Sequence, residues 1–230
     1  MPPSIRTDSN LTKSTRTLIV SPMKKYVTEF IGTFFLVFTI GMCVIEPGIG
    51  ALAPIAIGAS LMVMVYAGAH VSGAHYNPAV TLSVWLRGKC PASDVPGYWM
   101  AQVLAAVAAA FLVIYLKGNP TIPPAEIRIV PALVAEFVGT FALCYIVLNV
   151  ATAKANEGNF HYGVAIGSTV AAMAFAVGGI SGGAFNPAVA AGIILMHLVK
   201  ASTLWIYLLA NFTAGASAAA AFRWINPDDK

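Results

Sequence analysis

Two copies of an asparagine-proline-alanine triplet are the residues of this sequence whose types and spacing best suggest a chemical role. Asparagine before proline is typical of a helix start, with asparagine as the cap and proline in the first helical position. Each triplet therefore predicts an amide group held at the positive end of a helix, where it can donate a hydrogen bond to an oxygen and where cations are repelled. The copies are Asn77-Pro78-Ala79 and Asn186-Pro187-Ala188, and both lie in the same longer frame, Ser-Gly-x-x-x-Asn-Pro-Ala-Val.

The composition indicates the environment of these helices. Apolar residues make up 58% of the chain and charged residues 10%, against about 45–50% and about 25% in ordinary soluble domains. This predicts an all-α membrane protein and excludes a soluble enzyme. The basic residues are scattered singly, so no nucleic-acid partner is predicted. The three cysteines fit neither a disulfide framework nor a CxxC metal site, so no metal site is predicted from them.

The stretches without Asp, Glu, Lys or Arg predict how often the chain crosses the bilayer. Four of them have the length of one span, about 20 residues. The other two, 47–86 and 158–199, are about twice as long, too long for one helix across the membrane, and both contain a triplet. We expect six spans and two re-entrant half-helices, one from Asn77 to Arg87 and a slightly longer one from Asn186 to Lys200. The four shorter stretches are 30–45, 95–116, 137–153 and 201–222.

An internal repeat relates the two halves. The segment 26–34 is echoed by 133–141, at nearly the same offset as the one that separates the triplets. Each half holds three spans, and an odd number of spans inverts the second half relative to the first. The predicted division is a mobile tail at 1–23, a channel-like domain at 24–224 with repeats at about 24–116 and 131–224, and a second tail at 225–230.

The Lys and Arg residues predict the orientation, since cytoplasmic connections carry more of them. With the N-terminus inside, ten basic residues are cytoplasmic and three are outside. Both tails are then cytoplasmic, and a plasma or inner membrane is expected. The cytoplasmic set is Arg6, Lys13, Arg16, Lys24, Lys25, Arg87, Lys89, Lys154, Arg223 and Lys230, and the outer set is Lys117, Arg128 and Lys200.

The doubled triplet within its repeated frame resembles the aquaporin or major intrinsic protein family over roughly residues 24–224. The resemblance implies a bundle of six spans and two half-helices, a homotetramer with one pore per subunit, and no cofactor. The expected partners are water, small neutral solutes and the lipid bilayer. It also implies that Glu29 and Glu136, at matching places in the repeats, accept N–H bonds from the re-entrant loops. Proton coupling by these glutamates is the alternative.

The histidines around the first loop have two possible roles. For His70 and His75, packing and hydrogen bonding that support the loop are favoured over a pH gate. Gly32 and Gly139 are expected to allow close contact between helices.

The sequence departs from the family where the pore's outer filter is expected. Counting from the triplets, the filter positions are Ile57, Ala174, Gly183 and Val189. Water-selective members have a histidine where this chain has Ala174 and an arginine where it has Val189. The arginine-aspartate pair of glycerol-conducting members is missing too. An apolar mouth predicts weaker exclusion of larger neutral solutes, such as glycerol, urea, ammonia or undissociated metalloid acids, although apolar constrictions can also close by dewetting.

The leading hypothesis is a passive channel for water and small uncharged solutes. An ion- or proton-coupled transporter is the first alternative, since broken helices at the midplane are also typical of transporters. A non-conducting scaffold of the same fold is the second. No nucleophile, base and orienting group converge on the triplets, so no enzymatic activity is expected.

The apolar mouth generates a test. Val189→Arg, alone and with Ala174→His, should reduce the permeation of glycerol and urea much more than that of water, because a donor and a positive charge would narrow the mouth. The measurement is light scattering of proteoliposomes under osmotic shock. If the wild type already rejects every solute larger than water and the double variant changes nothing, either the filter assignment is wrong or another residue, such as Phe185 or an outer-loop side chain, closes the pore.

Overall fold

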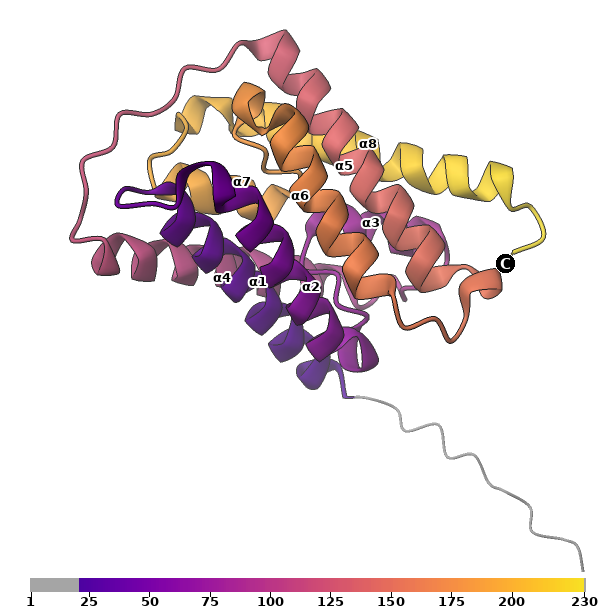
Figure 1. Cartoon of the computed structure of the whole chain (residues 1–230). Coiled ribbons are helices and arrows are strands. Elements are labelled where there is room, and N and C mark those ends of the chain that lie inside the picture. Colours follow the sequence, from indigo (N-terminus) through magenta and orange to yellow (C-terminus); the bar gives the residue numbers. More distant parts are fainter. Residues whose placement is uncertain (1–20, 230) are drawn as a thin grey trace, which may run out of the picture.

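The computed structural model describes residues 21–229, which fold into eight α-helices (Figure 1). Six helical segments of this part are long and apolar enough to cross a membrane, which confirms the six predicted spans. The predicted tail at 1–23 lies almost wholly outside the described residues. The helices are α1 (Pro22–Val44), α2 (Ala53–Ser72), α3 (Pro78–Leu86), α4 (Val95–Leu116), α5 (Ile129–Thr152), α6 (Tyr162–Ser181), α7 (Pro187–Leu195) and α8 (Leu204–Ile225).

The order of two long helices, one nine-residue helix and a third long helix occurs twice along the chain. The short helices lie where the triplets predicted them and each packs against the last helix of the opposite half, α3 against α8 and α7 against α4. The two halves are thus interlocked through their half-helices. At about 1.5 Å per residue, a nine-residue helix is about half as long as the hydrocarbon core is thick.

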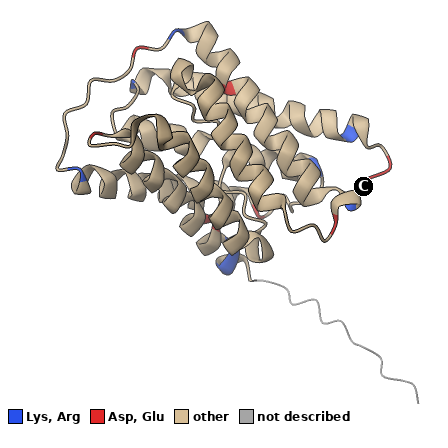
Figure 2. Cartoon of the chain, in the orientation of Figure 1, with Lys and Arg blue, Asp and Glu red and all other residues tan. Residues whose placement is uncertain are grey.

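The helix ends define two faces of the bundle. Lys25 donates to Asp94 at 2.8 Å, which joins the starts of α1 and α4 on the face that we call the Arg87 face. Lys117 donates to the carbonyl oxygens of Ile45 and Pro47 at 2.7 Å each, which joins the other ends of these helices on the Lys117 face. Figure 2 shows the charged residues mainly in the connections and near helix ends, with uncharged helix surfaces between them.

The second half-helix is shorter than expected, which corrects the predicted end at Lys200. α7 ends at Leu195 because the chain turns back in a Schellman motif, with N–H groups of His197 and Leu198 bonded to carbonyls one turn earlier. The turn needs a left-handed residue, and His197 supplies it with φ +59°. At the end of α3 the same position is a glycine, Gly88, with φ +84°. The helix end at His197 was not predicted because histidine is rarely the left-handed residue of this motif.

Gly32 and Gly139 have a different role from the predicted helix contact. A Cβ atom at Gly32 would clash with the ring of Tyr76, and one at Gly139 would clash with the ring of Phe185. These aromatic residues precede the two asparagines and are buried at 1% exposure. The glycines therefore make room for the re-entrant loops, which dock into α1 and α5 through their aromatic rings.

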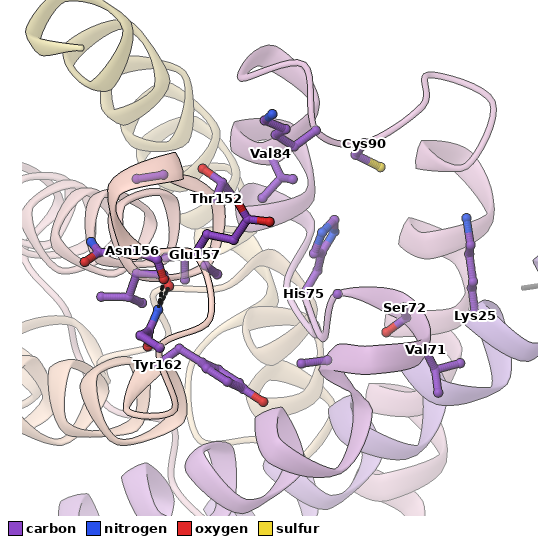
Figure 3. A pocket seen from close by; sticks show the side chains of 18 of the residues that line it. Lys25, Val71, Ser72, His75, Val84, Cys90, Thr152, Asn156, Glu157 and Tyr162 are labelled. Atoms are coloured by element: carbon purple, nitrogen blue, oxygen red, sulfur yellow. Dashed lines mark hydrogen bonds between the residues drawn. The ribbon is translucent and has the colours of Figure 1, made fainter. Parts of the chain in front are cut away.

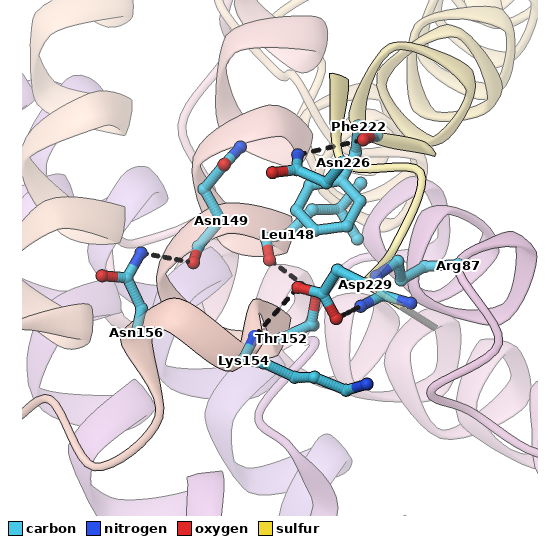
Figure 4. Close-up of polar contacts among 9 residues, drawn as sticks. All are labelled: Arg87, Leu148, Asn149, Thr152, Lys154, Asn156, Phe222, Asn226 and Asp229. Atoms are coloured by element: carbon cyan, nitrogen blue, oxygen red, sulfur yellow. Dashed lines mark hydrogen bonds and ion pairs between the residues drawn. The ribbon is translucent and has the colours of Figure 1, made fainter. Parts of the chain in front are cut away.

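The C-terminal residues are tied to the Arg87 face (Figure 4). Asp229 accepts a bond from the Lys154 N–H at 2.9 Å and one from the Arg87 guanidinium at 2.6 Å. The Lys154 N–H, with the Arg87 charge, holds the pKa of Asp229 below its usual value. Arg87 also lies over the ring of Phe222 at 4.6 Å. These contacts join the end of α3, the end of α8 and the connection after α5.

The close contact between Gly32 and the Tyr76 ring predicts that a larger residue at position 32 will destabilise the protein. Gly32→Ala should destabilise the protein by about 1–3 kcal/mol, the usual cost of overpacking a core, because the Tyr76 ring must move. Gly179→Ala on α6 is the matched control, since a Cβ there has no neighbour within 4 Å. Thermal unfolding in detergent measures both. Equal midpoints for the two variants would contradict the docking role of Gly32.

Candidate pore

The two asparagines of the triplets face each other across the contact between the half-helices. Each uses its side-chain oxygen to cap its own helix. The amide nitrogen of Asn77 donates to the carbonyl of Phe185, and that of Asn186 donates to the carbonyl of Tyr76, both at 2.9 Å. An amide nitrogen carries two hydrogens. Since both asparagines line one central cavity, the second hydrogen of each remains for an oxygen inside it.

Glu29 holds the first re-entrant loop in place. This fully buried carboxylate accepts four hydrogen bonds. The donors are the Ser72 hydroxyl at 2.7 Å, the backbone N–H groups of His75 and Tyr76 at 2.9 and 2.7 Å, and the Gln102 amide at 2.8 Å. The carboxylate thus satisfies backbone donors that have no water to bond inside a membrane.

Glu136 holds the second loop with a matching set of donors. They are the Ser181 hydroxyl at 2.7 Å and the N–H groups of Ala184 and Phe185 at 2.9 and 2.7 Å. With its amide nitrogen turned toward the carboxylate, Asn211 is the fourth donor at 3.1 Å. Each glutamate therefore uses all of the roughly four acceptor sites of a carboxylate.

The loop histidine that packs against the first half-helix is His75, and the support predicted for His70 is corrected. His75 is buried, with Nδ1 3.1 Å from the Thr81 hydroxyl and its ring 5.0 Å from that of Tyr98. His70 lies in the last turn of α2, where its side chain is exposed. The sequence did not distinguish the roles of the two histidines because both flank the same loop.

The central cavity has mostly aliphatic walls. Its volume is about 30 Å³, room for about two water molecules. No Asp, Glu, Lys or Arg of residues 21–229 lines it. Most of the aliphatic residues that line the cavity were not predicted from the sequence, although the repeat offsets relate them in pairs. They are Leu36 and Ile40 (α1), Ile57 and Leu61 (α2), Val80 (α3), Leu143 and Val147 (α5), Ile166 and Val170 (α6), and Val189 (α7).

The structure brings together three of the four predicted filter residues. Ile57, Gly183 and Val189 line the central cavity, whereas Ala174 does not. Ala174 lies one turn before Gly178 on α6, and a Cβ at Gly183 would be 3.0 Å from the Cα of Gly178. The second loop therefore passes very close to α6 at this level.

A second, larger cavity of about 700 Å³ opens on the Arg87 face (Figure 3). We call it the vestibule. The first re-entrant loop, the start of α4 and the connection between α5 and α6 line it. Its charged residues are Lys25, Lys89, Asp94, Lys154 and Glu157.

Comparison with known proteins agrees with this architecture. A family model described as Major intrinsic protein matches residues 16–222. The chain belongs to the major intrinsic protein family. Aquaporin NIP1-4 of Oryza sativa subsp. japonica is 38% identical over 212 residues, covering 88% of this chain and 77% of that protein. Aquaporin AqpM of Methanothermobacter thermautotrophicus is 32% identical over 247 residues, covering 91% and 100%.

The fold of this major intrinsic protein is also that of a solved relative. The X-ray structure of the aquaglyceroporin from Plasmodium falciparum superposes with a TM-score of 0.72 at 22% identity, covering 90% of this chain and 96% of that one.

The position of the two facing asparagines predicts which substitution would let cations through the pore. Asn77→Asp and Asn186→Asp keep the cap but add a negative charge between two positive helix ends, so cation leak should rise. Ala at either position should instead cost about 0.5–2 kcal/mol of cap stability. The measurement is potassium and proton flux into proteoliposomes. Asn149→Asp, on α5 outside the central cavity, is the control, and equal leak in all three aspartate variants would refute the assignment.

Proposed function

We propose that this chain is a passive channel through which water and small uncharged solutes cross a membrane. Family membership supports a channel for water and small solutes. The observation that carries the passive mechanism is the pair of cross-bonded asparagines in a mostly aliphatic cavity. A passing oxygen can accept a bond from each amide, while the positive helix ends repel cations.

Proton exclusion follows from the same geometry. A water molecule that accepts hydrogen bonds from both asparagines points its own hydrogens away from them, and this interrupts a chain of proton transfer. The two helix dipoles add a positive barrier at the same level. Since the filter positions carry no charge, we expect the barrier at the asparagines to account for most of the exclusion.

The buried glutamates argue against the coupled-transporter alternative. A proton carrier needs a carboxylate that can bind and release a proton during the cycle. Glu29 and Glu136 each accept four hydrogen bonds, and neither lines the central cavity. Protonating either one would break a bond that holds a re-entrant loop. Their role is therefore to support the loops.

We assign the Arg87 face to the cytoplasm of a cell bounded by a plasma or inner membrane. The excess of Lys and Arg in the connections on that side supports the assignment. We further propose a homotetramer with one pore per subunit, as the resemblance implies. Glycerol, urea, ammonia and undissociated metalloid acids are the candidate solutes, because the apolar mouth offers no donor that would favour water.

Proteoliposomes under osmotic shock test the channel. Water flux should exceed that of empty liposomes and should have an activation energy close to that of diffusion in bulk water. Ile57→Trp should reduce the flux strongly, because Ile57 lines the central cavity. Val63→Trp on the same helix is the control, since Val63 faces outward with 48% exposure.

Three results would overturn the proposal in different ways. Wild-type flux equal to that of empty liposomes at every temperature would favour the scaffold alternative. Accumulation of a solute against its gradient would favour the transporter. Equal loss of flux in the two tryptophan variants would show that the central cavity is not the path.

A further inference from the structure

The inverted repeat gives each filter position an equivalent residue in the other half of the chain, on the opposite side of the asparagines. We call Ile57, Ala174, Gly183 and Val189 the Lys117 ring. The offset that relates Asn77 to Asn186 gives their counterparts as Ile166, Val65, Ala74 and Val80, which we call the Arg87 ring. All four members of the Arg87 ring are buried. Three members of each ring line the central cavity, and the member that does not is the equivalent residue in both, Ala174 and Val65.

The helix directions place the two rings on opposite sides of the asparagines. α2 runs toward the Arg87 face, so Val65 lies two turns, about 12 Å, nearer that face than Ile57. α6 runs the other way, so Ile166 lies two turns nearer the Arg87 face than Ala174. Val80 follows Asn77 in α3, which leads toward the Arg87 face.

The Arg87 ring carries the larger side chains. Ala74 has one carbon more than its counterpart Gly183, whereas Val65 and Ala174, which differ by two carbons, do not line the central cavity. The remaining two pairs are identical, isoleucine with isoleucine and valine with valine. The loop residues differ in the same direction, since the counterpart of His75 is Ala184. His75 and Ala74 therefore fill more of the path on the Arg87 side than Ala184 and Gly183 do on the other side, whereas Val147 is one carbon smaller than its counterpart Ile40.

The boundary between the vestibule and the central cavity lies on the same side of the asparagines as the Arg87 ring. Among the described residues, only His75 and Val147 line both the vestibule and the central cavity. Figure 3 shows His75 projecting into the vestibule from the first loop. A solute that passes between the two cavities must therefore pass these two side chains. Val147 is 7% exposed.

We propose that the Arg87 ring, with the neck of His75 and Val147, sets the size limit for solutes in this channel, in place of the Lys117 ring. The proposal rests on the channel function proposed above. The physical reason is that the narrowest part of a pore decides which solutes pass. In this chain the members of the Lys117 ring that line the cavity are an isoleucine, a glycine and a valine, so the bulkier loop residues, His75 and Ala74, lie on the opposite side.

A matched pair of variants tests the proposal. Val80→Ala and Val189→Ala remove the same two methyl groups from equivalent places in the two repeats, where both valines are 2% exposed. The probe is the smallest polyol of the series glycerol, erythritol and xylitol that the wild type excludes. Val80→Ala should raise its permeability relative to water at least about tenfold, the discrimination that one methylene gives in an apolar site. Val189→Ala should change it little.

Val147→Ala gives a second reading from a different helix, in case Val80→Ala does not fold. It should also raise polyol permeability, because it widens the neck. A larger effect of Val189→Ala than of both other variants would return the filter to the Lys117 ring and overturn the proposal. No change in any of the three would overturn it as well. Absence of water flux in the wild type would instead refute the channel function itself.

Discussion

The satisfaction of backbone N–H groups at membrane depth is the constraint on which the rest of this structure depends. Two chain segments leave helical structure inside the bundle, where lipid offers their donors no hydrogen-bond partner. Glu29 and Glu136 meet this need, each with two backbone N–H groups, a serine hydroxyl and a side-chain amide. Once the loops are held, the half-helices start at fixed points and their asparagines can meet.

Aromatic packing completes the hold on each loop. Tyr76 and Phe185 adopt left-handed φ values of +51° and +48°, a conformation that costs free energy in residues other than glycine. Their rings fill the space left by glycines of α1 and α5, and their carbonyls accept the cross bonds from the opposite asparagines. The strain is thus offset by burial and by the contact that joins the two halves.

The duplication is followed closely in the supporting framework and less closely along the path. Capping asparagines, glutamates and aromatic rings have equivalent partners in both halves. The departures include residues that line the cavities, such as His75 against Ala184 and Ala74 against Gly183. Any difference between the two sides of the path must therefore come from the positions at which the halves differ.

Much of the fold could be predicted from sequence, because the signals are local. A charge-free stretch has the length of a span, and an Asn-Pro pair starts a helix whatever lies around it. The odd number of spans in each half predicted the inversion, and the filter positions were expected from the family resemblance by counting from the triplets. The loop N–H groups that the two glutamates bond were expected from the family resemblance, whereas the two serine hydroxyls and the amides of Gln102 and Asn211 were not foreseen.

Features that depend on contacts between residues far apart in the sequence were decided by the tertiary structure. The sequence alone determined the six spans and the two half-helix starts. It could not show that Gly32 makes room for Tyr76, that His75 rather than His70 is buried, or that His197 ends α7. Each of these depends on which side chains from separate segments meet in space. A cavity wall is likewise a property of several helices at once, so its residues become visible only when the helices are packed together.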